Sequence, residues 1–172
     1  MTIDELIKDK TIKTKEKTET ISNWISNHSL AIDELIAFAE KQKDSDKATC
    51  IEAIEYATKQ HPNIANEKVL TFVTKTLREK APRIKWESAK VIGNIAHLFP
   101  AKLDKSIANL LANTRHDGTV VRWSVAFALG EILKLNTKHS ENLLSEIEDI
   151  YEREEKNSIK KIYLNAIKKL KK

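Results

Sequence analysis

A nine-residue pattern recurs four times along this 172-residue chain at an almost constant interval. In each copy an apolar residue or Asp is followed by Lys or Arg, and a mostly small residue stands three positions later. The copies begin 38, 37 and 38 residues apart. Repeats of this length are typical of solenoids, in which each unit packs on the next. The copies are DKATCIEAI from Asp46, IKWESAKVI from Ile84, VRWSVAFAL from Val121 and IKKIYLNAI from Ile159.

A second amphipathic stretch precedes each copy, with apolar residues three and four positions apart, as in helices. In the third copy it contains Ile107, Leu110 and Leu111, and a turn at 116–119 leads into a helix predicted from 120 to about 135. Three Gly and three Pro are too few for the turns of an all-β protein. The sequence therefore predicts an all-α fold, an α-solenoid of about five helical hairpins and about ten helices.

The chain is expected to form a single domain, because no linker or low-complexity segment interrupts the repeats. Residues 1–28 match the pattern poorly and are interpreted as a degenerate N-terminal cap hairpin, as expected where one face of a terminal repeat meets water. The polar stretch Lys10 to Glu19 belongs to this cap. The predicted full repeats span 29–62, 63–100, 101–136 and 137–172.

The segment VRWSVAFAL resembles the signature V-R-x-x-A-x-x-A-L of the HEAT and HEAT-like repeat family. The resemblance extends over roughly residues 30–171, with departures at Asp46 and Tyr163. It implies a right-handed superhelix with the first helix of each pair on the convex side and the second on the concave side. It implies no particular chemistry, because function depends on side chains that the repeat leaves free.

At about 100° per residue, the second helix of each repeat has a core stripe, such as Val121, Val125 and Leu129, and an opposite row that includes Gly130. If the second helices line the concave side, these opposite rows form a ridge with an aromatic and basic middle, one basic end and one acidic end. The candidate ligand-binding residues on it are Trp86, Lys90, His97, Trp123, Phe127, Lys134, Lys161 and Lys168.

Trp86 and Trp123 lie one period apart, so stacking of repeats is expected to bring them side by side. Two interpretations stay open for them. Exposed indole rings flanked by lysines stack bases or hold a peptide side chain. Alternatively, the rings seal the seam between hairpins, since Gly93 and Gly130 indicate that the second helices approach closely.

The basic residue of the pattern recurs in all four copies, and we interpret it as structural, not as a phosphate-binding ladder. Each cation follows an acid of the preceding turn by three to six residues, so an internal ladder of ion pairs is predicted. The cations are Lys47, Lys85, Arg122 and Lys160, and the acids are Asp44, Glu79, Asp117 and Glu155.

The chain carries no recognisable catalytic or metal-binding motif. Its histidines fall near helix ends of different hairpins, and no glycine-rich phosphate loop occurs. No catalytic residue, metal or cofactor is therefore expected. The single cysteine, Cys50, occupies a small core position, and no apolar stretch approaches the roughly 20 residues of a membrane helix. These features favour a cytoplasmic setting without membrane contact.

The sequence favours a non-catalytic scaffold that binds a macromolecular partner, most simply a protein, through its concave surface. The net charge of +5 supports an alternative, a nucleic-acid-binding protein that uses the basic and Trp residues of that surface. A third hypothesis is an enzyme similar to the HEAT-like proteins that repair alkylated DNA bases. That resemblance implies an essential carboxylate near the Trp residues, for which Glu87 and Glu131 are the nearest candidates.

Overall fold

The computed structural model describes residues 1–171. Within them the chain forms ten α-helices and two short 3₁₀ helices, and no strand is present. The all-α prediction and the five predicted hairpins are thus confirmed. The elements are α1 (Ile3–Lys8), α2 (Thr14–Ser26), α3 (Ile32–Glu40), α4 (Asp44–Gln60), η1 (Pro62–Ile64), α5 (Glu67–Thr76), α6 (Pro82–Ile95), η2 (Ala96–Leu98), α7 (Asp104–Leu111), α8 (Thr119–Lys134), α9 (Ser140–Arg153) and α10 (Asn157–Leu170).

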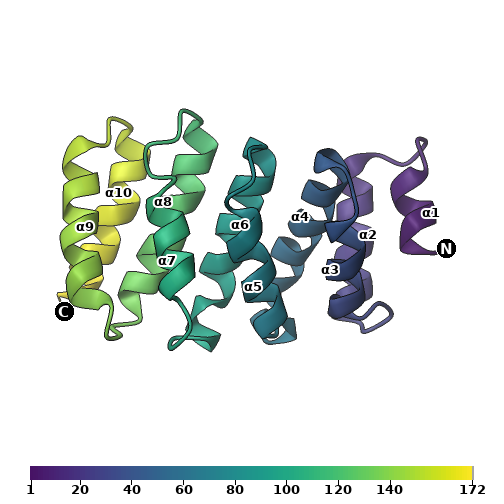
Figure 1. The fold of residues 1–172 in the computed structure, drawn as a ribbon, viewed down its shortest axis with the longest axis horizontal. Coiled ribbons are helices and arrows are strands. Elements are labelled where there is room, and N and C mark those ends of the chain that lie inside the picture. The colour runs from purple at the N-terminus through teal and green to yellow at the C-terminus, as the bar shows by residue number, and fades with distance from the viewer. Residues whose placement is uncertain (172) are drawn as a thin grey trace.

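The helices form two layers that run the length of the molecule (Figure 1). The second helices of the hairpins, α2, α4, α6, α8 and α10, pack extensively against one another, whereas successive first helices touch at only a few positions. Helices packed more closely lie on the shorter arc of a curved stack. We therefore call the second helices the inner layer and the first helices, α1, α3, α5, α7 and α9, the outer layer.

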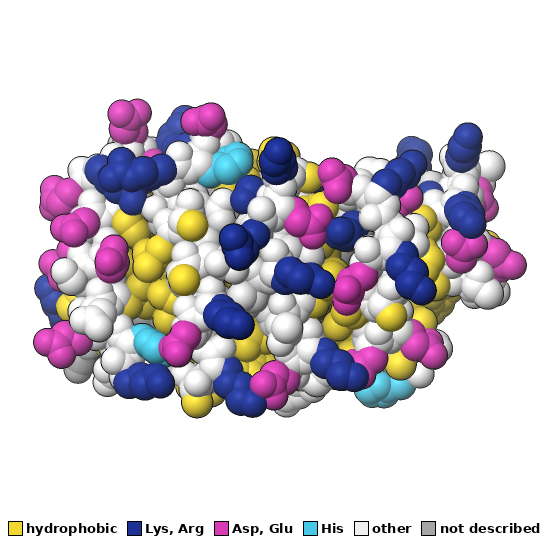
Figure 2. Space-filling view, viewed as in Figure 1, with side chains coloured by type: hydrophobic (Ala, Val, Ile, Leu, Met, Phe, Trp, Pro, Cys, Tyr) yellow, Lys and Arg dark blue, Asp and Glu magenta, His cyan; other side chains and the backbone are white. Residues whose placement is uncertain are grey.

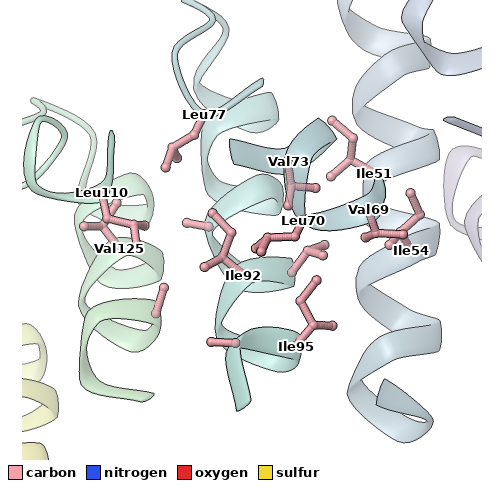
Figure 3. Packing of buried hydrophobic residues seen from close by; sticks show 14 of the residues in the cluster. Ile51, Ile54, Val69, Leu70, Val73, Leu77, Ile92, Ile95, Leu110 and Val125 are labelled. Carbon is pink, nitrogen blue, oxygen red and sulfur yellow. The ribbon is translucent and has the colours of Figure 1, made fainter. Parts of the chain in front are cut away.

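A continuous apolar core lies between the two layers. Figure 3 shows how it is built around α5, whose buried Val69, Leu70 and Val73 lie between side chains of α4 and α6. The predicted core stripe of α8 is also buried, with Val121, Val125 and Leu129 fully inaccessible. Apolar spacing of three and four residues predicted these positions because it places them on one side of a helix.

Local sequence fixes several helix ends. Thr2 and Glu5 form a capping box on α1, and the Asn66 side chain accepts a hydrogen bond from the amide of Val69 at the start of α5. Pro82 opens α6, where its missing amide hydrogen is harmless. Past the end of α8, Asn136 adopts a positive φ of 53°, the left-handed turn that often stops a helix.

The N-terminal hairpin is more regular than its sequence suggests. Helix α2 starts at Thr14, so the second half of the polar stretch Lys10 to Glu19 is helical, and Thr18 is fully buried. At its other end α2 stops before His28, which has a positive φ of 64°. No helix within residues 1–171 combines the length and apolar character needed to cross a membrane.

Candidate binding surface on the inner layer

The predicted ligand-binding residues lie on α6, η2, α8 and α10, but they differ in accessibility. His97, Trp123, Lys134, Lys161 and Lys168 are exposed. The other three, Trp86, Lys90 and Phe127, are half-buried. The helical projection therefore found the outward side of the inner layer, although neighbouring helices partly cover its middle.

The aromatic residues divide between the two interpretations. Trp123 exposes 41% of its surface, more than any other aromatic side chain among the described residues. Its ring stacks on Phe127 of the same helix, with centroids 6.2 Å apart and planes at 14°. Trp86, by contrast, packs against the core. Within residues 1–171 the stacked aromatic pair is Trp123–Phe127, and of the two indoles only that of Trp123 is exposed.

Phe127 belongs to the seam between α6 and α8. A methyl group added at Gly93 would overlap the Phe127 ring at Cε2, so the ring occupies the space that the glycine leaves on α6. A methyl group added at Gly130 would lie 3.4 Å from Ala166 Cβ of α10, which is an ordinary contact distance. Packing between neighbouring second helices thus accounts for the half-buried Phe127 ring and for the small residues at positions 93 and 130. It does not account for the exposure of Trp123.

Val120 extends the exposed apolar surface of α8 and was missed in the sequence. It lies three residues before Trp123, so both side chains fall on one side of the helix, and it is 51% exposed. The sequence has two adjacent valines, Val120 and Val121, at the start of this helix. Only Val121 belongs to the core stripe, which indicated that Val120 lies outside the core. We call Val120, Trp123 and Phe127 the aromatic patch.

The seam between α4 and α6 is charged. Lys90 lies 2.6 Å from Glu87 and 3.7 Å from Glu55, and both carboxylates are almost completely buried. Each carboxylate keeps one buried oxygen without a hydrogen-bond partner in the described residues. Two carboxylates thus share one ammonium group away from water. Lys90, predicted to flank the aromatic residues, is held in this seam.

The pKa values in this seam reflect burial and charge. Burial raises the pKa of Glu87, and the hydrogen bond and charge of Lys90 only partly oppose the rise. For Lys90, burial alone lowers the pKa, but the hydrogen bond to Glu87 and the charges of Glu87, Glu55 and Glu52 outweigh it and raise the pKa. The ammonium group therefore stays charged, whereas Glu87 binds a proton more readily than an exposed glutamate.

A second ion pair continues the charged seam toward the start of α6. Arg83 bonds to Glu52 of α4 and also donates to the carbonyl of Ser45 and the hydroxyl of Thr49. Sequence analysis did not single out Arg83, because one arginine after Pro82 carries no periodic signal. Glu52, Glu55, Glu87, Arg83 and Lys90 together form what we call the charged seam.

The predicted internal ladder of cations exists, but its partners differ from those expected. Lys47 pairs with Glu79 at 3.0 Å, and Arg122 with Glu154 at 3.2 Å through two of its nitrogens. Both acids come from the turn of the following repeat, so Asp44, Asp117 and Glu155 are not the partners. Spacing along one repeat suggested local pairs, whereas the side chains reach across to the next hairpin.

The other two cations find different partners. Lys85 donates to the carbonyl of Leu77 in its own hairpin and to Asn113 in the following repeat, at 3.0 and 2.9 Å. Lys160, in the last repeat, lies 4.6 Å from the centre of the Tyr151 ring. These cations therefore hold hairpins together and are not free to bind phosphate.

Residues 1–171 contain no cluster of three His, Cys, Asp or Glu side chains arranged to hold a metal ion. Cys50 is buried, and burial raises the pKa of its thiol to about 12. The thiolate needed for nucleophilic or metal chemistry is thus disfavoured.

Comparison with known proteins identifies the fold but not a family. No protein-family model matches the chain, and no curated protein is detectably similar. A designed armadillo repeat protein superposes with a TM-score of 0.69 at 14% identity, over 98% of this chain and 80% of that one. The chain is thus a helical-repeat solenoid.

Two engineered proteins solved by a structural genomics consortium share this fold. One gives a TM-score of 0.76 at 14% identity, over 99% of this chain and 47% of that one. The other gives 0.66 at 15% identity, over 98% and 79%. These likenesses support a helical-repeat stack without favouring HEAT repeats over armadillo repeats.

Proposed function

We propose that this chain is a non-catalytic, HEAT-like interaction module that binds a protein partner through the inner layer, with the aromatic patch as its anchor. The observation that carries the proposal is the exposure of Trp123 and Val120 on a rigid helix. Interface energy is concentrated in a few large residues, among which Trp is enriched. Stacking on Phe127 holds the indole in place, so little side-chain entropy is lost on binding.

The charges of the inner layer favour a protein over a nucleic acid. Lys90 is engaged by two carboxylates, and Lys134 by Glu131 at 2.9 Å. Arg83 is likewise paired with Glu52, so carboxylates already neutralise these cations of the inner layer. A protein interface tolerates charges of both signs around an apolar centre.

One observation supports the nucleic-acid alternative. Lys161 and Lys168 are exposed on α10 and make no ion pair within residues 1–171. Together with Trp123 they offer phosphate contacts and one stacking surface. This arrangement covers only one end of the inner layer, so we rank it second.

The repair-enzyme hypothesis finds little support in the geometry. The unpartnered oxygen of Glu87 is enclosed, and the other oxygen is held by Lys90. A carboxylate must contact the reacting base or its attacking water, which an enclosed group does not do. A cytoplasmic setting remains part of the proposal and depends on the single buried Cys50.

The proposal is tested by affinity capture from a cell extract with the full chain and with Trp123→Ala and Trp86→Ala. We expect a discrete protein to be retained at about 0.3 M salt, where exposed charges are largely screened. Trp123→Ala is expected to weaken binding by about 2 kcal/mol, or roughly thirty-fold, whereas the half-buried Trp86 contributes less. Lys59→Ala, which changes an exposed lysine outside the patch, serves as the control.

Labelled single-stranded and duplex DNA are titrated in parallel at low and near-physiological salt. Binding that falls steeply with salt and is lost in Trp123→Ala would make the nucleic-acid alternative correct. Retention of the same protein by wild type and Trp123→Ala would remove the aromatic patch from the interface.

A further inference from the structure

The outer layer carries a groove that the proposed function does not use. It lies between α5 and α7, which touch at only a few positions, and has a volume of about 540 Å³. Its floor contains the buried hydroxyls of Thr74 and Ser106, 2.7 Å apart, and Asn109 donates to the carbonyl of Thr74. The polar groups that bridge α5 and α7 thus form hydrogen bonds with one another. These bonds fix the floor of the groove.

Four cations line this outer groove: Lys75, Arg78, Lys102 and Lys105. Figure 2 views the outer layer and shows Lys and Arg side chains over α5 and α7, whereas Asp and Glu side chains crowd the edge over α9. Arg78 and Lys105 are exposed and make no side-chain hydrogen bond or ion pair within residues 1–171. Within the described residues, the groove thus holds two cations, Arg78 and Lys105, without an acidic partner, and one acid, Asp104, without a Lys or Arg partner.

The other two cations are available at small cost. Lys75 pairs with Glu40 at 3.2 Å and Lys102 with Glu67 at 2.6 Å, and all four side chains are about half exposed. Exposed pairs of this kind contribute little, so an incoming anion can replace the carboxylates. The remaining acid of the groove, Asp104, lies 2.7 Å from His139.

The spacing of the cations indicates the shape of the ligand. Lys102 and Lys105 lie at the start of α7, whereas Lys75 and Arg78 lie at the end of α5, and α5 and α7 run in the same direction as equivalent first helices. At about 1.5 Å per residue, the ten residues of α5 from Glu67 to Thr76 span roughly 15 Å. Lys102 and Arg78 therefore lie toward opposite ends of the groove.

We propose that the outer groove binds an extended acidic segment of a partner protein. Carboxylates on alternate residues of such a segment lie about 7 Å apart, which matches cations spread along two helices. Arg78 offers the planar donor pair that binds carboxylates in bidentate fashion. Among the described residues, no aromatic side chain lines the groove, so bases have nothing to stack on.

The test uses a fluorescein-labelled octa-glutamate peptide, with octa-glutamine as its uncharged counterpart, titrated into the full chain at about 50 mM salt. We expect octa-glutamate to bind and octa-glutamine not to bind. The double variant Arg78→Gln, Lys105→Gln is expected to weaken octa-glutamate binding about five-fold, and Arg78→Glu, Lys105→Glu to abolish it. These residues are exposed, so the fold is retained, which thermal unfolding followed by circular dichroism verifies.

The matched control is Lys59→Gln, Lys138→Gln, which removes two exposed lysines outside the groove. It is expected to weaken binding less than about two-fold, and Trp123→Ala is expected to leave binding unchanged, which separates the outer groove from the aromatic patch. Equal weakening by the control pair would overturn the proposal, because net charge alone would then explain binding. So would a failure of octa-glutamate to bind, or tighter binding of an eight-nucleotide oligothymidylate that the Arg78→Gln, Lys105→Gln variant removes.

Discussion

In the inner layer, α6 faces α4 across the charged seam and faces α8 across a seam filled by the Phe127 ring. The two seams differ in their side chains at equivalent positions of successive repeats. One such position holds Glu52, Lys90 and Phe127 in turn. Another holds Glu55, Gly93 and Gly130. The two helix pairs, α4 with α6 and α6 with α8, are nevertheless in contact to a similar extent. The repeat thus fixes the backbone and the core stripe, whereas the side chains between neighbouring second helices are free to be ionic or aromatic.

The two seams should respond differently to substitution. In the charged seam, removing one charge leaves buried partners without compensation. In the aromatic seam, stability depends on how well one ring fits one glycine.

The largest effect is expected from Lys90→Met. Glu87 and Glu55 would lose their shared cation while remaining buried, and we expect the free energy of unfolding at pH 7 to fall by about 2 kcal/mol. Urea unfolding followed by circular dichroism measures it. Lys134→Met is the matched control, because Lys134 also follows its glutamate by three residues but at the surface.

We expect Lys134→Met to lower the free energy of unfolding by less than about 0.5 kcal/mol. Equal effects of the two substitutions would mean that the charged seam is no more dependent on its ion pairs than the surface is.

A smaller effect is expected from Gly93→Ala. The new methyl group would displace the Phe127 ring, and we expect destabilisation by about 1 kcal/mol despite the better helix propensity of alanine. Gly130→Ala, where only ordinary contacts are met, is expected to stabilise by roughly 0.5 kcal/mol.

A double-mutant cycle isolates the contact. In a Phe127→Ala background, Gly93→Ala should no longer destabilise, because the ring that it displaces is absent. Persistence of the destabilisation in that background would show that another neighbour, and not Phe127, limits the size of residue 93.

The smallest effect at neutral pH is expected from Glu87→Gln, which tests the charged seam through pH. Because the pKa of Glu87 is raised by folding, the folded chain holds this proton more tightly than the unfolded chain. Wild-type stability should therefore decrease as the pH rises from the ordinary value of 4.5 through the raised pKa.

Glu87→Gln removes this contribution, so the stability of the variant relative to wild type should increase from pH 4 to pH 7. Urea unfolding across this range measures the difference. A constant difference would mean that Glu87 ionises normally despite its burial.

Sequence alone predicted the helices and the core, because both depend on apolar spacing within one repeat. Helix α8 was placed within one residue at each end, and Val121 and Leu129 are buried as expected. The exposed side of the inner layer followed from the same periodicity, which is why Trp123 was found.

Contacts between repeats could not be predicted in the same way. Glu79 was assigned to Lys85 by proximity in the sequence, yet it binds Lys47, 32 residues away. Similarly, no sequence signal shows that Phe127 fills the space at Gly93 while Trp123 stays exposed, since that depends on how closely α6 and α8 approach. The outer groove was missed because its four cations come from two hairpins and follow no period.

The links from Lys47 to Glu79, from Lys85 to Asn113 and from Arg122 to Glu154 all run from one hairpin to the next toward the C-terminus. This ladder of cations therefore has a direction, although other bonds between repeats, such as those from Arg83 to Glu52 and from Asn109 to Thr74, run the opposite way. Removing the last repeat of such a link from the C-terminal side would leave the cation without its partner. Removing the first repeat of the link from the N-terminal side would instead leave the acceptor without its donor. During synthesis, Lys47, Lys85 and Arg122 can each reach their partner in the next repeat only after that repeat has been made, so these three links close in the order of translation.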